Sequence, residues 1–412
     1  MKIVIHRGSN EIGGTCIELA TVGTKLLLDL GLPLGGDGRT LDVHAMRPDA
    51  VIVSHPHQDH FGLIEILDPS VPVYLSVLSK KLIDAPRIFL HKELLRNDFR
   101  YFAREQFFSI GDFTITPYLV DHSAPDAYAF LIEAEGKRIV YSGDFRGHGR
   151  KAKLHRRMVA KPPSDIDVLF MEGTMLNRSN EAFPSEASVE EKIFQTIRRQ
   201  DNISFLIASS QNIDRLVSAY RACRRASKIL VVDIYTAWIL EQMRIVSSSV
   251  PTMDWEDISV FVGYGQYRTL QDNPDVFGDF QGRVFQNRVT KEDLASCPAD
   301  YLYFGKMHMA PIIRRYFGEN PVNVIYSQWL GYLKCSDEEY FGAEGIAALQ
   351  NDPMANFVFA HTSGHATVED LREFASAINP GALIPVHTEY GCEYSMHFDK
   401  VICLRNAEEI RI

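Results

Sequence analysis

The chain of 412 residues is long enough for two or three domains, because a single hydrophobic core stops growing beyond a couple of hundred residues. Hydrophobic residues make up 46% of the sequence and charged residues 23%, which are the proportions of an ordinary soluble globular protein. No apolar run approaches the roughly 18 residues that a membrane-spanning helix needs, so we expect no membrane anchor. The net charge of −10 disfavours a protein that coats nucleic acid through a uniformly basic surface.

The N-terminus and the cysteines indicate the compartment. The sequence enters a strand pattern at residue 2, without the basic region, apolar core and cleavage site of a signal peptide, so we expect a cytoplasmic protein. The six cysteines lie far apart and form no CxxC pair, which predicts neither a disulfide framework nor a thiolate zinc site. We expect reduced and mostly buried thiols.

Short β-branched and aliphatic runs separated by Gly and Asp turns fill the first 171 residues and predict sheets with few helices. One helix is expected over residues 90–106, because four basic residues spaced by four would share a helical face: Lys92, Arg96, Arg100 and Arg104. The expected strands are residues 2–5, 15–19, 25–28, 50–53, 113–119, 129–133, 138–142 and 168–171.

The pattern changes near Ser185, where a helix is expected and strands begin to alternate with helices. This alternation is typical of an α/β unit with a parallel sheet. We expect strands at 203–208, 229–232, 301–304 and 322–326, with helices near 213–225 and 236–247. A last strand, helix and strand are expected at 357–360, 368–378 and 382–386.

The densest group of metal-ligand residues lies directly after the expected strand at 50–53. It places His55, His57, Asp59 and His60 within six residues. Neutral imidazole and carboxylate are the ligands that zinc prefers when no thiolates are offered. Packing requirements rarely produce such density, so the sequence predicts a metal site here.

Ligand-type residues also follow other expected strands. Loops from one sheet edge converge in space, so we expect several of these residues to complete the metal site. They are His122, Asp144, Glu172, His361, His365 and His387.

Several motifs resemble those of the metallo-β-lactamase fold and, within it, of the β-CASP nucleases, most closely ribonuclease J. Residues 55–60 match the HxHxDH signature, residues 121–127 look like the third motif of ribonuclease J, and residues 142–144 match the fourth. Three β-CASP motifs are matched by Glu172 in MEGT, His365 in SGHA and His387 in PVHTE. Of the strand-end candidates, His361 has no motif match and is expected to be structural.

The resemblance implies an α/β fold: a metallo-β-lactamase αββα sandwich with an inserted α/β β-CASP domain. We expect the sandwich to comprise residues 1–184 and 353–412, and the inserted domain residues 185–352. The chain stops soon after His387, so we expect the appended C-terminal domain of ribonuclease J to be missing. That puts the usual assembly in doubt, and a homodimer stays open.

The resemblance also assigns two zinc ions, with manganese as the alternative metal. Two metals about 3.5–4 Å apart stabilise both the attacking and the leaving oxygen of a phosphoryl reaction, and a bound water loses a proton near neutral pH. That hydroxide is the expected nucleophile. The implied ligands are His55, His57 and His122 for one ion, Asp59, His60 and His387 for the other, and Asp144 as the bridge.

The catalytic candidates are Asp59, Glu172 and His365. By analogy, His365 holds the scissile phosphate or protonates the leaving oxygen, while Glu172 accepts a hydrogen bond that orients an imidazole. The turn formed by Ser363, Gly364, His365 and Ala366 is expected to bind substrate, because a glycine turn that opens a helix can offer N–H groups to an anion.

Two basic runs favour a polyanionic substrate. Residues 145–164 contain seven Lys and Arg residues and no acid, beginning beside Asp144. A second group lies at Arg215, Arg221, Arg224, Arg225 and Lys228. A groove between the domains is therefore expected to be positive despite the net charge.

The leading interpretation is a two-zinc hydrolase that cleaves RNA phosphodiester bonds from an end or internally, with single-stranded RNA held between the domains. Relatives in DNA repair carry valine at the last motif, so His387 favours RNA. A small-molecule ester, thioester or lactam hydrolase and a DNA nuclease on the same fold remain alternatives. A nucleic-acid-binding subunit with an inactive site is disfavoured, because all the ligands are present.

Overall fold

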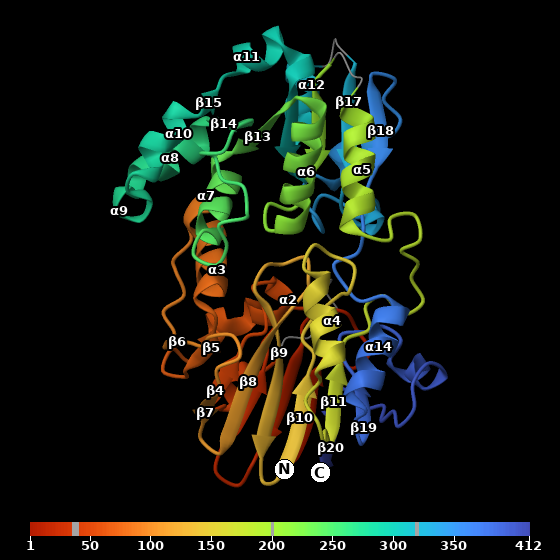
Figure 1. Ribbon diagram of the computed structural model, residues 1–412. Helices are drawn as coiled ribbons and strands as arrows, with labels where there is room; N and C mark the ends of the chain where they lie inside the picture. Colours follow the sequence, from red (N-terminus) through yellow and green to blue (C-terminus); the bar gives the residue numbers. More distant parts are fainter. Residues whose placement is uncertain (35–40, 199–201, 318–320) are drawn as a thin grey trace. The chain divides into compact units, whose positions relative to one another are not determined.

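The computed structural model describes residues 1–34, 41–198, 202–317 and 321–412, which divide into two compact units (Figure 1). The first unit contains residues 1–83, 94–180 and 363–412, and the second contains residues 84–93 and 181–362. Both chain ends belong to the first unit, where the amino group of Met1 donates to the carbonyl oxygen of Ile412 at 3.1 Å. Among the described residues, every helix is too short or too polar to cross a membrane.

The first unit is built on two sheets. One has the strand order β20-β1-β2-β3-β4-β5-β6, and the other has the order β19-β11-β10-β9-β8-β7. The first sheet comprises β1 (Lys2–Arg7), β2 (Cys16–Ala20), β3 (Lys25–Leu28), β4 (Ala50–Ile52), β5 (Val73–Leu75), β6 (Phe99–Tyr101) and β20 (Glu409–Arg411). The second comprises β7 (Phe108–Ile110), β8 (Phe113–Val120), β9 (Ala127–Ala134), β10 (Lys137–Tyr141), β11 (Val168–Met171) and β19 (Ala382–Pro385).

Three apolar clusters hold this unit together as four layers. The central cluster joins Ile3, Ile17 and Leu26 of the first sheet to Phe130 and Ile139 of the second. An outer cluster packs helices α4 (Ala152–Ala160) and α14 (Val368–Ile378) against the second sheet (Figure 1). Another packs α1 (Val43–Met46), η1 (Gly62–Ile66) and α3 (Val77–Phe89) against the first sheet. Two helical layers around two sheets confirm the expected αββα sandwich.

The second unit is an α/β unit, as the alternation predicts. Its sheet has the order β15-β14-β13-β16-β12-β17-β18, and every pair is parallel. The strands are β12 (Ser204–Ile207), β13 (Ile229–Asp233), β14 (Ile258–Phe261), β15 (Arg288–Val289), β16 (Tyr301–Gly305), β17 (Val322–Tyr326) and β18 (Ala355–Phe359). The helices include α5 (Glu186–Ile197) and α6 (Ile213–Ala226), side by side in Figure 1, with α7 (Ile234–Met243), α8 (Tyr264–Asp272), α9 (Pro274–Phe277), α10 (Phe280–Gln286), α11 (Lys291–Ser296), α12 (Ala310–Phe317) and α13 (Ala343–Leu349).

The expected helix at 90–106 is wrong. The helix lies earlier, at α3, and ends before His91, whose φ of 53° is left-handed. Beyond it, Phe99–Tyr101 forms β6, which pairs with β5 in parallel. The spacing of the four basic residues says where their charges would lie if the segment were a helix, but it does not show that a helix forms. The strand forms because the apolar residues Phe99 and Phe102 pack into the cores on the two sides of the sheet.

The expectation of mostly buried thiols is wrong for half of the cysteines. Cys16 and Cys223 are buried and Cys335 is half-buried. The exposed thiols belong to Cys297, Cys392 and Cys403, which lie outside strands and long helices.

Candidate metal centre

The strand directions bring the predicted ligands to one edge of the sandwich. β10, β11 and β19 are parallel neighbours, so their carboxyl ends place Asp144, Glu172 and His387 at the same edge. β8 runs antiparallel to β9, which runs antiparallel to β10, so His122 after β8 reaches that edge as well. In the other sheet, β3 and β4 are parallel, and the loop after β4 carries His55.

A short helix presents the remaining ligands of the HxHxDH segment. α2 (Gln58–Phe61) begins directly after His57, with Asp59 in its first turn and His60 at its end. The carbonyl oxygen of Asp59 accepts from the N–H of Thr15 at 3.1 Å. A Cβ atom at Gly31 would overlap that carbonyl oxygen, so only glycine allows the chain to pass this closely.

Four overlapping groups of three ligand atoms meet within 4.8 Å among the described residues. Two match the implied sets, His55, His57 and His122, and Asp59, His60 and His387; the other two contain Asp144, with His55 and His60 or with His365 and His387. In the first set, Nδ1 of His57 lies 3.1 Å from Nε2 of His55 and 3.3 Å from Nε2 of His122. Ligand nitrogens about 2.0–2.1 Å from one tetrahedral zinc lie roughly 3.3 Å apart, so these spacings suit zinc. That each set holds an ion stays a prediction.

Asp144 lies next to members of both sets. Its Oδ2 is 3.1 Å from Nε2 of His60, 3.6 Å from Nε2 of His387 and 3.7 Å from Nε2 of His55. Burial alone would raise the pKa of Asp144, but His387, His60 and His365 hold it well below its usual range. The side chain is therefore an ionised carboxylate with two oxygens for cations.

Buried polar atoms that point into this centre fit a metal. Within the described residues, both carboxylate oxygens of Asp144 lack a hydrogen-bond partner, as do Nε2 of His60 and Nε2 of His387. A buried polar atom without a partner costs about 1–3 kcal/mol, and native proteins seldom leave several together. Cations at the centre would satisfy these atoms.

Hydrogen bonds on the far side of the rings fix the orientation of three ligands. Nδ1 of His60 lies 2.7 Å from Oδ2 of Asp29, Nδ1 of His387 lies 2.8 Å from Oγ1 of Thr15, and Nδ1 of His122 lies 2.6 Å from the carbonyl oxygen of Gly364. The carboxylate and the carbonyl accept the Nδ1 protons of His60 and His122, which turns their Nε2 atoms toward the centre, whereas Nδ1 of His387 also accepts from the N–H of Gly13 at 3.4 Å. His387 also has a left-handed φ of 51°, and its N–H donates to the carbonyl oxygen of Gly8 at 2.7 Å.

Asp29 is the functional residue that motif reasoning missed. Besides His60, it accepts from the N–H of Ser54 at 2.7 Å, the hydroxyl of Ser54 at 2.8 Å and the hydroxyl of Tyr141 at 2.5 Å. The signal was present in the sequence, because Asp29 follows β3 as the other candidates follow their strands.

Burial sets the protonation of most of the imidazoles. It lowers the pKa of His57 to about 4, lowers that of His387, and holds those of His55 and His122 well below the ordinary value. These four rings are therefore neutral, which is the ligand form. Burial also acts on His60, but Asp144, Asp29 and Asp59 outweigh it and raise its pKa well above the ordinary value.

His365 and Glu172 form a pair beside the ligands. Nδ1 of His365 lies 3.3 Å from Oε2 of Glu172 and 3.6 Å from Oδ2 of Asp144. Burial lowers the pKa of His365, but Glu172 and Asp144 raise it to about 8 overall. Glu172 is buried and also accepts from the N–H groups of Phe145, Thr174 and Ala366. It therefore orients the His365 ring, whose side chain stays 20% exposed.

The turn at 363–366 differs from the expectation that its N–H groups are offered to an anion. The N–H of Ser363 donates to Asn180, that of His365 to Oγ of Ser363, and that of Ala366 to Glu172. A Cβ atom at Gly364 would overlap Oγ of Ser123. Three of its four N–H groups are thus bonded within the protein, so the N–H of Gly364 and the imidazole of His365 are the candidates for substrate contact, and substrate binding by the turn stays a prediction.

His361 is not part of the cluster. It belongs to the second unit, where its Nδ1 lies 3.2 Å from the carbonyl oxygen of Ser327. The structural role expected of it agrees with this placement.

The second basic group does not form a free positive surface. Arg215 is fully buried against Glu186, and Arg221 lies 3.1 Å from Glu190. Arg224 pairs with Glu256 and Asp257, and Arg225 with Glu190 and Glu191. Acids distant in sequence thus offset the charge of these four arginines, and the expected positive groove between the domains stays a prediction.

The first basic run, residues 145–164, contains both buried and exposed cations. Arg146 is buried and donates to the carbonyl oxygen of Ser363 at 2.7 Å, which holds the turn that carries His365. Lys153, Arg156 and Lys161 are exposed at or beside α4. Arg157 is exposed as well but pairs with Glu105 at 3.0 Å, so among the described residues the other three offer the free positive charge of this helix to a polyanion.

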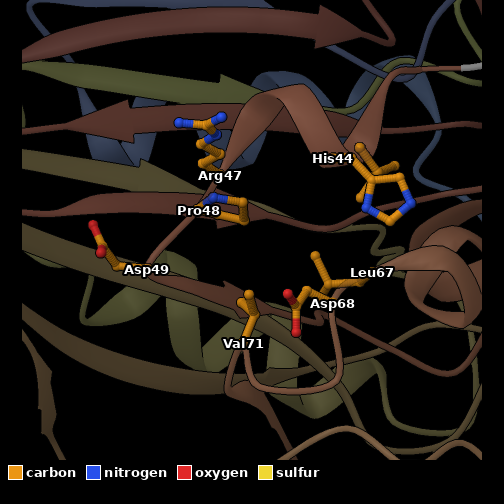
Figure 2. Close-up of a pocket in the computed structure, with 8 residues that line it drawn as sticks. His44, Arg47, Pro48, Asp49, Leu67, Asp68 and Val71 are labelled. Carbon is orange, nitrogen blue, oxygen red and sulfur yellow. The ribbon is translucent and has the colours of Figure 1, made fainter.

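A separate hollow in the first unit is lined by residues around α1 and after η1 (Figure 2). His44, Asp49 and Asp68 are among its lining residues, and none of the predicted ligands is. The hollow is therefore distinct from the candidate centre.

Comparisons with known proteins give two family matches. Residues 31–231 match the Beta-lactamase superfamily domain, and residues 354–396 match the Zn-dependent metallo-hydrolase RNA specificity domain. The second match includes His365 and His387.

Three relatives are similar to this chain over half or more of their own length. Ribonuclease J of Mycoplasma pneumoniae is 22% identical over 94% of this chain and 68% of its own length. Ribonuclease J of Sinorhizobium meliloti is 26% identical over 88% of this chain and 63% of its own length. A protein of Methanocaldococcus jannaschii named probable RNase MJ4 is 28% identical over 48% of this chain and 50% of its own. The chain thus spans about half to two thirds of the length of these relatives.

One solved structure shares the whole fold. A protein of unknown function from Enterococcus faecalis covers 99% of both chains with a TM-score of 0.74 and 19% sequence identity. At that identity the likeness concerns the fold alone.

Proposed function

Because this chain belongs to the metallo-β-lactamase superfamily and to its ribonuclease J-like β-CASP group, we propose that it hydrolyses phosphodiester bonds in RNA with two zinc ions. The observation that carries the proposal is the convergence of His55, His57, His122 and Asp59, His60, His387 around the unpartnered carboxylate of Asp144. Manganese is the alternative metal for the same oxygen and nitrogen ligands.

Each ion has its own ligands in the proposal. His55, His57 and His122 would hold one, Asp59, His60 and His387 the other, and Asp144 would share its two oxygens between them. When bound, the two ions would supply a hydroxide from water near neutral pH and offset the charge that develops on the phosphate.

The protein's own residues then act on the substrate. Glu172 holds Nδ1 of His365, so Nε2 is left to face a phosphate oxygen or to give a proton to the leaving oxygen. Asp59 is 13% exposed at the edge of its ligand set and can accept a proton from the attacking water. Arg146 and the packed turn at 363–366 keep His365 in place.

RNA is favoured as the substrate by two observations beyond the metal ligands. The matched C-terminal region is described as an RNA specificity domain, and it contains both His365 and His387. The exposed Lys153, Arg156 and Lys161 in the first unit offer positive charge to a phosphate backbone.

The test uses purified full-length chain loaded with zinc or with manganese. Its substrates are end-labelled 5′-monophosphorylated RNA, 5′-triphosphorylated RNA and single-stranded DNA. We expect RNA cleavage by the wild type, loss of at least a hundredfold in Asp144→Ala, and a large loss in His365→Ala. His361→Ala is the matched control, because His361 is also a strand-end histidine but lies outside the cluster, and it should keep its activity.

The products decide the mode of cleavage. Mononucleotides from the 5′ end would indicate exonucleolytic action, and internal fragments would indicate endonucleolytic action. Hydrolysis of a small ester without cleavage of any polymer would overturn the proposal in favour of a small-molecule hydrolase. Preference for DNA would overturn the RNA assignment, and equal activity in Asp144→Ala would assign the activity to a contaminant.

A further inference from the structure

Two exposed cysteines lie together on the C-terminal segment of the first unit. Cys392 belongs to the short helix η5 (Gly391–Met396), and Cys403 lies just before the buried Leu404. Sγ of Cys403 is 3.3 Å from the carbonyl oxygen of Gly391, the residue that precedes Cys392, so the side chain of Cys403 lies against the backbone beside Cys392. Neither the hydrolytic centre nor its supporting hydrogen bonds use these thiols.

The other cysteines offer no such pair. Cys16 and Cys223 are fully buried, one in each unit, and burial raises the pKa of both thiols. Cys297 is exposed, but it belongs to the second unit together with the half-buried Cys335, whose thiol donates to the carbonyl oxygen of Gly331 at 3.7 Å. Cys392 and Cys403 are thus the two exposed cysteines that share a unit.

The segment that the two cysteines enclose is attached to the candidate centre. Tyr394 is buried, and its hydroxyl donates to the carbonyl oxygen of Glu172. Gly391 packs so closely on Ser9 that a Cβ atom would lie 2.6 Å from the carbonyl oxygen of Ser9. His387 lies only five residues before Cys392. A covalent link between the ends of this segment would therefore fix the loop that contacts Glu172.

We propose that Cys392 and Cys403 are a modification site at which a peroxide forms a reversible disulfide that ties down residues 392–403. The inference concerns the thiols and the loop, so it stands whether or not the protein cleaves RNA. It concerns one reversible disulfide and is compatible with the expectation that the cysteine spacing forms no disulfide framework.

The chemistry balances with hydrogen peroxide as the oxidant. In the proposed reaction the thiolate of Cys392 attacks the peroxide first. Its sulfur takes one peroxide oxygen as the O–O bond breaks, giving a sulfenic acid and one water. The sulfur of Cys403 then displaces the hydroxyl as a second water while the S–S bond forms. Both sulfurs are oxidised, the peroxide is reduced, and a dithiol reductant reverses the reaction.

The experiment uses the full chain loaded with zinc and freed of reductant. After mild treatment with hydrogen peroxide, free thiols are counted under denaturing conditions, and proteolytic peptides are mapped by mass spectrometry without reduction. We expect the wild type to lose two of its six thiols and the mass of two hydrogens, with one crosslinked peptide pair containing Cys392 and Cys403. Dithiothreitol should restore all of them.

Substitutions assign the pair. Cys392→Ser and Cys403→Ser should each prevent the crosslink, whereas Cys297→Ser, the matched control for an exposed thiol, should lose two thiols like the wild type. Cys403→Ala provides a second variant should the serine disturb packing beside Leu404. The oxidised wild type should also melt several degrees above its reduced form, because closing a loop restricts the unfolded chain, and Cys403→Ser should show no such shift.

A crosslink that involves any other cysteine would overturn the proposal. So would an unchanged thiol count at peroxide concentrations that form disulfides in other exposed dithiols, or oxidation of single cysteines to sulfinic acid without a crosslink.

Discussion

Asp29 lies behind the candidate metal centre, where it orients His60. It accepts four hydrogen bonds, from Nδ1 of His60, from both donors of Ser54 and from the hydroxyl of Tyr141. A carboxylate with this many donors is fully immobilised, and it fixes His60 with Nε2 toward Asp144. The sequence offered this residue only as another carboxylate after a strand.

Replacing Asp29 by Asn should weaken zinc binding by about 10–100-fold, which is the usual effect of losing a partner behind a ligand histidine. The amide keeps the shape but removes the charge that holds the Nδ1 proton of His60. Zinc affinity measured by competition with a chromophoric chelator tests this. Asp49→Asn is the matched control, because Asp49 also accepts a backbone N–H, that of Lys25, but is remote from the predicted ligands. Equal affinities in the wild type and in Asp29→Asn would contradict the role.

At the scale of elements, helices α5 and α6 depend on one buried ion pair. Nη2 and Nε of Arg215 on α6 donate to the carboxylate of Glu186 on α5 at 3.1 and 3.2 Å, and both residues are fully buried. Nη1 of Arg215 also donates to the carbonyl oxygen of Ser327 at 2.7 Å. Removing one partner leaves the other charge desolvated, which is costlier than the pair itself.

Arg215→Met should lower the free energy of unfolding of the second unit by about 3–5 kcal/mol, measured by urea denaturation. The double variant Arg215→Met with Glu186→Gln should recover part of the loss, because the buried charge is gone. Arg221→Met on the same helix is the matched control. Its side chain is 61% exposed, so its pair with Glu190 is worth only about 0–1 kcal/mol. A similar loss in both single variants would refute the argument.

Glu18 on β2 makes ion pairs with Lys2 and His6 on β1 and with Lys25 on β3, and the stability they provide should decrease in acid. Burial tends to raise the pKa of Glu18 on β2, but hydrogen bonds with His6 and Lys2 lower it to about 2 from an ordinary value of 4.5. A carboxyl whose pKa is lowered by folding stabilises the protein fully above its unfolded pKa, and that contribution disappears as the pH falls toward the folded pKa.

Glu18→Gln should therefore destabilise the protein most above about pH 4.5, and the difference from the wild type should shrink steadily toward pH 2. Unfolding by urea at a series of pH values measures this difference. Glu133→Gln serves as the comparison, because Glu133 also faces a cation, Arg138, but is 38% exposed. A difference that stays constant across this range would show that Glu18 acts only by packing.

For the whole molecule, the sequence predicted those features that depend on local residue pattern and residue type. Alternation and apolar runs identified β3, β11 and β17 to the residue, and the ligand types after strands identified the cluster that the parallel strands assemble. The misplaced helix at 90–106 came from charge spacing, which carries no information about packing. The basic group at 215–228 looked free because its acidic partners, such as Glu186 and Asp257, are brought to it only by folding.

The assembly of the cluster from distant segments predicts where a metal stabilises the molecule. All seven predicted ligands lie in the first unit, on segments that follow β4, β8, β10 and β19. A metal ion that binds only the native state stabilises it by about 2.7 kcal/mol when its concentration is a hundred times the dissociation constant. We expect the stabilisation to be greatest in the segments that carry the residues bound to the metal.

Hydrogen exchange followed by mass spectrometry should accordingly show that zinc slows exchange in residues 50–62, 120–145 and 382–390. The parallel strands β12, β13 and β16 of the second unit should be unchanged, since they carry none of the predicted ligands. Asp144→Asn, which removes the charge between the two ligand sets, should abolish the protection without altering exchange in the second unit. If zinc instead slowed exchange around Cys392 and Cys403 or in the second unit, the metal would bind elsewhere.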